Sequence, residues 1–176
     1  MATDQELFAS AVRVGQSLLE ERLRLVTAES CTAGWIAKAL TDVAGSSRWF
    51  ECGYVTYSDA AKIRDLGVSA ATIAAHGAVS EQTVREMATG AIRVSGADIA
   101  VAVSGIAGPD GGSPQKPVGT VWLCVARRSG EIFTAVERFP GNRENVRRLT
   151  VERALQRVVN LVSSGLLESG AQRDWR

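Results

Sequence analysis

The stretch 24–40, RLVTAESCTAGWIAKAL, joins an apolar run to a run with helical spacing, and this junction decides the fold. Residues 24–29 have the composition of a short buried strand. Residues 31–43 have the spacing of a helix. Four polar or reactive residues stand at the junction: Glu29, Ser30, Cys31 and Thr32. A strand that passes directly into a helix is typical of α/β proteins, and such junctions can present a nucleophile.

The rest of the chain alternates between helical and extended patterns. Apolar spacing with capping residues and glycine stops predicts further helices at 4–22, 58–66, 81–95 and 142–164. Alternating or continuous apolar runs predict strands at 52–57, 98–105, 119–126 and 132–139, the last two as an antiparallel hairpin. We therefore expect an α/β fold, a single three-layer domain in which helices flank a mixed β-sheet.

The length and composition fit one globular domain. With 176 residues and 45% apolar residues the chain can bury a core, and we expect one domain over 1–176, with its core at 5–165 and a flexible tail at 166–176. A net charge of +1 argues against a nucleic-acid surface, and no apolar run has the length of a membrane span. The three cysteines lack metal-ligand spacing, and the N-terminus is unlike a signal peptide, so we expect a cytoplasmic protein with reduced thiols and no metal.

Ser30 lies where the predicted strand ends and the predicted helix begins. Backbone N–H groups at a helix start are unpaired and partly positive, so they can stabilise an oxyanion beside the serine. The alternative is that Ser30 or Thr32 only caps the helix. Cys31 has no evident neighbour that would stabilise a thiolate, so we assign it to packing.

A serine nucleophile needs a base, and Lys62 is the candidate. The single histidine, His76, lies beside a glycine in a predicted loop, where a structural role is more common. A lysine kept neutral by burial is the other kind of base. If the strands 24–29 and 52–57 are parallel, their carboxyl ends meet at one sheet edge, where Ser30, Tyr57 and Lys62 converge. The alternative for Lys62 is a solvated position on a helix.

Ser47 is a second candidate nucleophile. It precedes the strand 52–57, so the same argument places it at the opposite sheet edge, unless the strand starts late and the loop folds back. The alternative is a helix stop followed by a turn at Gly45, Ser46 and Ser47.

Two further stretches suit an anionic ligand. Residues 104–112, SGIAGPDGG, follow a buried strand and match neither a Walker loop nor a Rossmann fingerprint. Their glycines would let backbone N–H groups approach a ligand, and the alternative is a structural turn. Arg143 falls in the first turn of the last helix and shares a face with Arg147, where guanidinium groups could bind a phosphate. The alternative is a solvated basic face, paired with Glu144.

In combination these motifs resemble one family. ESCTAG, GSS, YSDAAK, GAVSE, SGIAGPDGGSPQKPVGTVW and FPGNRENVR, in this order over about residues 5–165, resemble the C-terminal domain of the competence/damage-inducible CinA family, whose stand-alone members are nicotinamide-nucleotide amidohydrolases. The resemblance implies hydrolysis of nicotinamide mononucleotide (NMN) to nicotinate mononucleotide and ammonia. It implies a Ser/Lys mechanism without metal or cofactor, and a homodimer. From the net charge and the apolar runs we expect no nucleic-acid or membrane partner.

The resemblance also implies roles for single residues. Lys62 becomes the base, and Ser30 and Ser47 both match serines of the family's active-site motifs; the topological argument favours Ser30 as the nucleophile. Tyr57 is assigned to proton relay or orientation, and Arg143 to the phosphate. Substrate or oxyanion contacts are assigned to Thr32, Ser104, Gly105 and Gly108.

Three positions depart from the common family pattern. Ala33 stands in place of a glycine, Asp59 in place of an asparagine and Ser104 in place of a threonine. Ala33 is expected to narrow the space beside the helix start, and Asp59 to raise the pKa of Lys62 and so disfavour the neutral base. Both changes favour a rival interpretation, a non-catalytic regulatory module that binds a pyridine nucleotide. A third interpretation, an interaction protein, has only the family name behind it.

Overall fold

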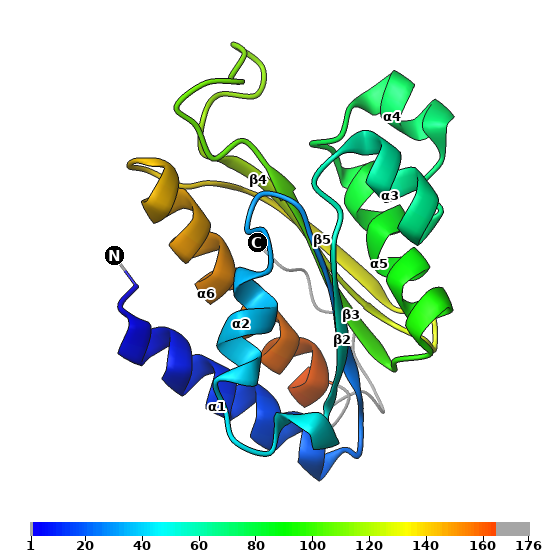
Figure 1. Ribbon diagram of the computed structural model, residues 1–176, viewed down its shortest axis with the longest axis vertical. Coiled ribbons are helices and arrows are strands. Elements are labelled where there is room, and N and C mark those ends of the chain that lie inside the picture. Colours follow the sequence, from blue (N-terminus) through cyan, green and yellow to red (C-terminus); the bar gives the residue numbers. More distant parts are fainter. Residues whose placement is uncertain (1, 165–176) are drawn as a thin grey trace.

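The computed structural model describes residues 2–164, which form a five-stranded sheet between two layers of helices (Figure 1). The strands are β1 (Leu25–Glu29), β2 (Phe50–Val55), β3 (Ile99–Gly105), β4 (Thr120–Arg127) and β5 (Ile132–Arg138). The helices are α1 (Asp4–Glu20), α2 (Trp35–Thr41), α3 (Asp59–Leu66), α4 (Ala70–His76), α5 (Glu81–Ser95) and α6 (Arg143–Ser164), with a 3-10 turn, η1 (Ser46–Arg48). The predicted single α/β domain with a mixed sheet is confirmed. The predicted tail at 166–176 lies outside the described residues.

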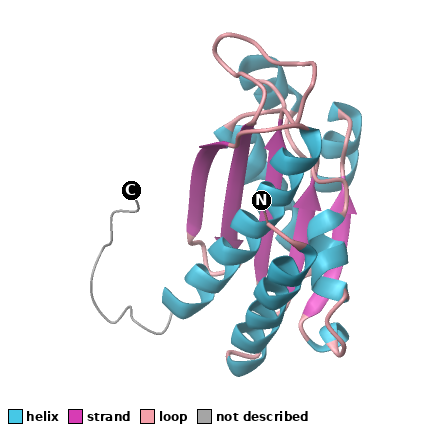
Figure 2. Cartoon of the chain, turned by 90° about the vertical axis from the view of Figure 1, so that its left-hand side faces the viewer, coloured by secondary structure: helices cyan, strands magenta, loops and turns pink. Residues whose placement is uncertain are grey.

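The order of the strands brings three carboxyl ends to one edge. The sheet runs β2-β1-β3-β4-β5, with β1 parallel to both β2 and β3, and with β4 and β5 antiparallel to their neighbours. Glu29, the last residue of β1, pairs with Val55 of β2 and Val103 of β3. Figure 2 shows the strands side by side, with long loops gathered beyond one end of the sheet.

Each face of the sheet has its own core. Helices α1, α2 and α6 cover one face, and α3, α4 and α5 cover the other (Figure 1). In β3 the side chains alternate, so that Val101 and Val103 join the first core while Ala100 and Ala102 join the second. Burial on both faces explains why β3 is almost continuously apolar.

Two helices differ from the predicted pattern. The helix expected at 31–43 begins only at Trp35, because Ala33 and Gly34 are left-handed, with φ of 51° and 90°. A turn therefore separates β1 from α2. Helix α4 was not predicted: Ser69 caps it, but none of its residues is fully buried, so no apolar periodicity marks it in the sequence.

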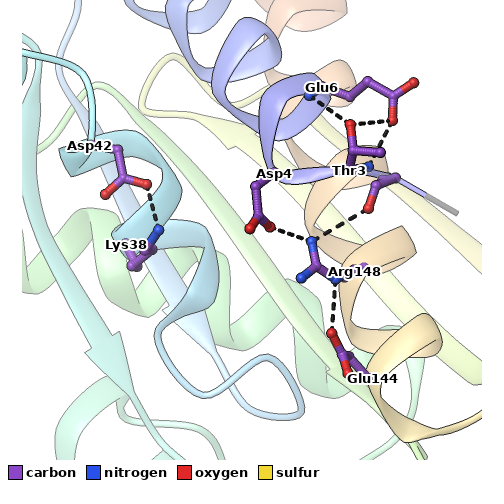
Figure 3. A network of polar contacts seen from close by, with 8 residues as sticks. Thr3, Asp4, Glu6, Lys38, Asp42, Glu144 and Arg148 are labelled. Atoms are coloured by element: carbon purple, nitrogen blue, oxygen red, sulfur yellow. Dashed lines mark hydrogen bonds and ion pairs between the residues drawn. The ribbon is translucent and has the colours of Figure 1, made fainter.

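Polar contacts connect the N-terminal residues to α6. Thr3 and Glu6 form the predicted capping box at the start of α1. Arg148 of α6 contacts the Asp4 carboxylate and also lies 3.1 Å from the Glu144 carboxylate on its own helix (Figure 3). These contacts hold α1 and α6 side by side on one face of the sheet. Within residues 2–164, no helix is both long enough and apolar enough to cross a membrane.

Candidate active site

The predicted pair of Ser30 and Lys62 is brought together at the carboxyl ends of β1 and β2. Ser30 follows β1 directly, and Lys62 lies in α3, which Ser58 caps. The Lys62 Nζ lies 3.1 Å from the Ser30 Oγ. Lys62 is 1% exposed and Ser30 is 8% exposed, so both groups are withdrawn from water. The alternative of a solvated Lys62 is wrong.

Two backbone carbonyls fix the direction of the Lys62 amine. Its Nζ donates to the carbonyl oxygen of Thr56 at 2.8 Å and to that of Tyr57 at 3.3 Å. Burial lowers the pKa of Lys62 below the ordinary lysine value, and the Asp59 carboxylate opposes this as a smaller cause. Asp59 therefore moderates the shift in pKa and does not reverse it.

Glu29 is a buried carboxylate that the sequence analysis gave no role. It is fully buried, and its Oε2 accepts from the Thr32 hydroxyl at 2.7 Å and from the backbone N–H groups of Gly34 and Ile36, each at 3.0 Å. Its Oε1 accepts from the N–H of Ala37 at 2.8 Å. The carboxylate thus caps α2 from inside and fixes the turn that carries Ser30. The signal in the sequence was a lone charge at the end of an apolar strand.

This cap changes which N–H groups can meet an oxyanion. The start of α2 was expected to supply them, but Glu29 occupies its N–H groups, and the N–H of Ser30 donates to the Val103 carbonyl at 3.1 Å. Within residues 30–37, only the N–H groups of Cys31 and Thr32 have no oxygen acceptor in the structure. The turn itself, rather than the helix, therefore offers the donors.

The side chains of Cys31 and Thr32 both face the protein interior. Burial raises the pKa of the Cys31 thiol to about 12, which leaves almost no thiolate at neutral pH and supports its assignment to packing. Thr32 is fully buried, and its hydroxyl donates a hydrogen bond to the Glu29 carboxylate. The Thr32 side chain, assigned above to substrate contact, is therefore committed to the turn, and its backbone N–H is the group left for a ligand.

Ser47 lies at the other end of the sheet. It belongs to η1, and the Trp49 carbonyl that follows accepts from the N–H of Leu25, the first residue of β1. Ser30 follows the last residue of β1, so the length of that strand, about 16 Å, separates the two serines within one chain. Ser47 is exposed and does not reach Lys62 of its own chain.

The side chains of Tyr57 and Arg143 contact each other. The Arg143 Nη2 donates to the Tyr57 hydroxyl at 3.1 Å, and the Arg143 Nη1 donates to the Gly108 carbonyl at 3.0 Å. Tyr57 is 59% exposed, and its carbonyl rather than its hydroxyl contacts Lys62. A proton relay through this hydroxyl is therefore not what the geometry favours. Arg143 ties α6 to the glycine-rich loop and to the end of β2.

Ser104 lies beside Ser30 on the neighbouring strand. The register of β1 and β3 continues one step beyond Glu29 and Val103, which sets Ser30 opposite Ser104. Ser104 is buried, and its hydroxyl donates to the Ala78 carbonyl at 2.7 Å. Its oxygen can still accept a hydrogen bond on the side of the candidate site.

The two glycines assigned to ligand contact have a packing reason as well. A Cβ on Gly105 would lie 2.6 Å from a Val121 methyl group, and one on Gly108 would lie 2.6 Å from a Val118 methyl group. Gly108 also has a φ of 81°. Close packing at the base of the loop 106–119 therefore accounts for both glycines.

The remaining candidates have structural contacts. Arg147, paired with Arg143 by sequence, instead donates from Nη2 to the Thr32 carbonyl at 2.8 Å. His76 ends α4, and its carbonyl accepts from the Lys116 amine at 2.8 Å. Among residues 2–164, no three His, Cys, Asp or Glu side chains gather in a group that could hold a metal ion.

Comparison with known proteins assigns the chain to a family. The family described as the CinA C-terminal domain matches residues 8–162. Nicotinamide-nucleotide amidohydrolase PncC of Escherichia coli K12 is 55% identical over 154 residues, 88% of this chain and 93% of that protein. PncC of Pseudomonas putida is 54% identical over 151 residues, 86% and 94% of the two chains. The crystal structure of the competence/damage inducible protein CihA from Agrobacterium tumefaciens aligns with a TM-score of 0.87 at 43% identity, over 92% of this chain and 97% of that one. The chain belongs to the CinA C-terminal domain family.

Proposed function

We propose that the protein is a nicotinamide-nucleotide amidohydrolase that converts NMN and water to nicotinate mononucleotide and ammonia. The amidohydrolases named PncC support this substrate, since they align with nearly the whole chain at 54–55% identity. The observation that carries the chemistry is the buried pair of Ser30 and Lys62, 3.1 Å apart. Nucleophile and base at this distance are the arrangement that acyl transfer requires.

The carbonyls around Lys62 support its role as the base. A neutral amine has two N–H donors and one lone pair, and carbonyl oxygens can only accept. When Lys62 is neutral, the carbonyls of Thr56 and Tyr57 can take its two N–H groups, and its lone pair is left for the Ser30 hydroxyl 3.1 Å away. The lowered pKa of Lys62 raises the fraction of neutral amine at a given pH.

The reaction then proceeds in two halves. Lys62 takes the Ser30 proton while the Ser30 Oγ attacks the carboxamide carbon, and the N–H groups of Cys31 and Thr32 stabilise the oxyanion. The Lys62 ammonium gives its proton to the departing nitrogen, which leaves as ammonia. Water, deprotonated by Lys62, attacks the acyl-enzyme, and the proton returns to Ser30 as nicotinate mononucleotide is released.

Three other residues and one loop are proposed to hold the nucleotide. Arg143, exposed at the start of α6, is assigned to the phosphate, for which it has donors beyond those used on Gly108 and Tyr57. Of the two roles expected for Tyr57, proton relay and orientation, we propose orientation, with its ring as one wall of the site. Ser104 and the backbone of the loop 106–119 are assigned to the nicotinamide and ribose side.

The test is ammonia release from NMN by the purified protein and four variants. Ser30→Ala and Lys62→Met should each lower kcat at least about a thousandfold, because each removes a member of the reacting pair. Ser47→Ala and Lys38→Met change a matched serine and lysine on the exposed surface and should retain activity. Loss of activity in Ser47→Ala with activity kept in Ser30→Ala would move the nucleophile to Ser47.

The two features that favoured the binding-module interpretation give it limited support. Ala33 is exposed, and Asp59 is the smaller influence on the pKa of Lys62. Wild-type protein that binds NMN but releases no ammonia would nevertheless restore it. A homodimer and a cytoplasmic location also remain proposals, for which sedimentation equilibrium and cell fractionation are the measurements.

A further inference from the structure

Arg147 joins the last helix to the turn that carries Ser30. Its Nη2 donates at 2.8 Å to the carbonyl of Thr32, two residues after Ser30 and 115 residues before Arg147 in the chain. No residue of α6 is near Ser30 in sequence, so this bond sets where the turn lies relative to a distant helix. The Thr32 N–H, at the other end of the same residue, is one of the proposed oxyanion donors.

The same guanidinium also packs on the first residue of α2. The Arg147 Cζ lies 5.2 Å from the centre of the Trp35 ring, which is cation–π distance. Arg147 therefore contacts the turn through the Thr32 carbonyl and the start of α2 through Trp35. Glu29 holds the same turn from the sheet side through the Thr32 hydroxyl and three backbone N–H groups.

We propose that Arg147 is a positioning residue, which holds Ser30 and the oxyanion donors of Cys31 and Thr32 in register with Lys62. The turn contains two left-handed residues, Ala33 and Gly34, and is not part of a regular helix or strand. Without Arg147, the turn loses its hydrogen bond to α6, while Lys62 keeps its position on α3. A displacement of about 1 Å between reacting groups is enough to lower a rate a hundredfold.

Arg148 provides a matched control on the neighbouring position. Its Cζ lies 4.9 Å from the same Trp35 ring, but its hydrogen bonds go to Asp4, Glu144 and the Ala2 carbonyl, none of which belongs to the turn. Arg147→Met and Arg148→Met thus both remove an arginine stacked on Trp35. Only the first also removes a bond to the turn.

The experiment measures kcat and KM for NMN, and hydrogen–deuterium exchange of backbone amides in residues 30–37, in both variants. Because the inference rests on the proposed function, exchange provides a readout that does not depend on NMN. We expect Arg147→Met to lower kcat about tenfold or more with KM within about twofold, and to speed exchange in 30–37. Arg148→Met should leave both within about twofold of wild type.

The other possible results of this experiment also decide for or against the positioning role of Arg147. Equal effects of the two variants on exchange and kcat would overturn the proposal, as would a rise in KM alone, which would make Arg147 a substrate ligand. If the wild type releases no ammonia, the proposed function fails, but the exchange measurement still tests the positioning role. Faster exchange in Arg147→Met alone supports that role, and unchanged exchange in Arg147→Met contradicts it. Arg147→Lys keeps a donor for the Thr32 carbonyl and should recover part of kcat; it also carries the comparison if Arg147→Met does not fold.

Discussion

At the scale of single residues, the charge state of Lys62 has the largest influence on the proposed reaction. Burial lowers its pKa, and Asp59, three positions earlier on α3, stabilises the ammonium and acts against burial. The neutral amine is the reactive form, so activity should rise as the pH rises through the pKa of Lys62 in the folded protein. Asp59 shifts that rise toward higher pH.

We expect Asp59→Asn to move the acid limb of the pH profile of kcat/KM to lower pH. Removing the carboxylate lowers the pKa of Lys62 further, so the neutral amine persists to lower pH; the change should be a few tenths of a pH unit, because Asp59 is exposed. Asp65→Asn is the control, since Asp65 lies on the same helix but pairs with Arg64. An acid limb that stays in place in Asp59→Asn would show that Lys62 is not the titrating group.

Sequence reasoning at this scale found the reacting pair but not its surroundings. Ser30 and Lys62 could be predicted because two parallel strands bring their carboxyl ends together, whichever residues follow. Glu29 could not, because a carboxylate at a strand end is usually solvated, and only the path of the chain after Ser30 folds three N–H groups over it. The contact of the Tyr57 hydroxyl with Arg143, rather than with Lys62, could not be predicted because a sequence pattern does not show where a side chain points.

Among the elements, the turn between β1 and α2 is the strained one. Ala33 has a φ of 51°, a left-handed conformation that costs a residue with a Cβ about 1–2 kcal/mol. Glycine would relieve this cost, while the greater freedom of glycine in the unfolded chain offsets about 0.4–1 kcal/mol of the gain.

Ala33→Gly should therefore raise the free energy of unfolding by about 0.5–1 kcal/mol. Urea denaturation measures the change. Ala74→Gly, at an exposed position inside α4, is the matched control and should lower stability by about 1 kcal/mol. A loss of stability in Ala33→Gly would mean that the left-handed turn is not adopted in solution.

The boundaries of the elements were predictable where burial is regular. Helix α5, at 81–95, has an unbroken apolar face, a serine cap and a glycine stop, and it was predicted to the residue. Helix α2 was predicted too long, because the sequence 31–34 continues the apolar spacing although Ala33 and Gly34 do not adopt helical angles. Local backbone angles decided there, and periodicity does not report them.

At the scale of the whole molecule, the hydrophobic core under α1 and the residues proposed to react lie in different parts of the structure. Helix α1 packs on the face of the sheet shared with α2 and α6, and its Leu18 is fully buried in that core. The residues proposed to react lie beyond the carboxyl ends of the strands, with Lys62 on the opposite face. The core of α1 can therefore be weakened without touching the reacting pair.

We expect Leu18→Ala to lower the free energy of unfolding by about 2–5 kcal/mol, because it leaves a cavity in a closely packed core. The kcat of the folded fraction should be unchanged. Equilibrium denaturation gives the first quantity, and ammonia release well below the melting temperature gives the second. A kcat that falls together with stability would mean that the α1 core is coupled to the site.

The bond between Arg147 and Thr32 has a consequence for the order in which a chain acquires its chemistry. Glu29 closes the inner half of the turn with groups no more than eight residues ahead of it, whereas the outer half waits for a residue 115 positions later. A nascent chain emerging from the ribosome can therefore form the strand, the turn and Lys62 long before α6 exists to dock on them. On this view, the turn gains its full set of contacts only when synthesis has passed Arg147, so a shorter nascent chain holds Ser30 in a less fixed position relative to Lys62.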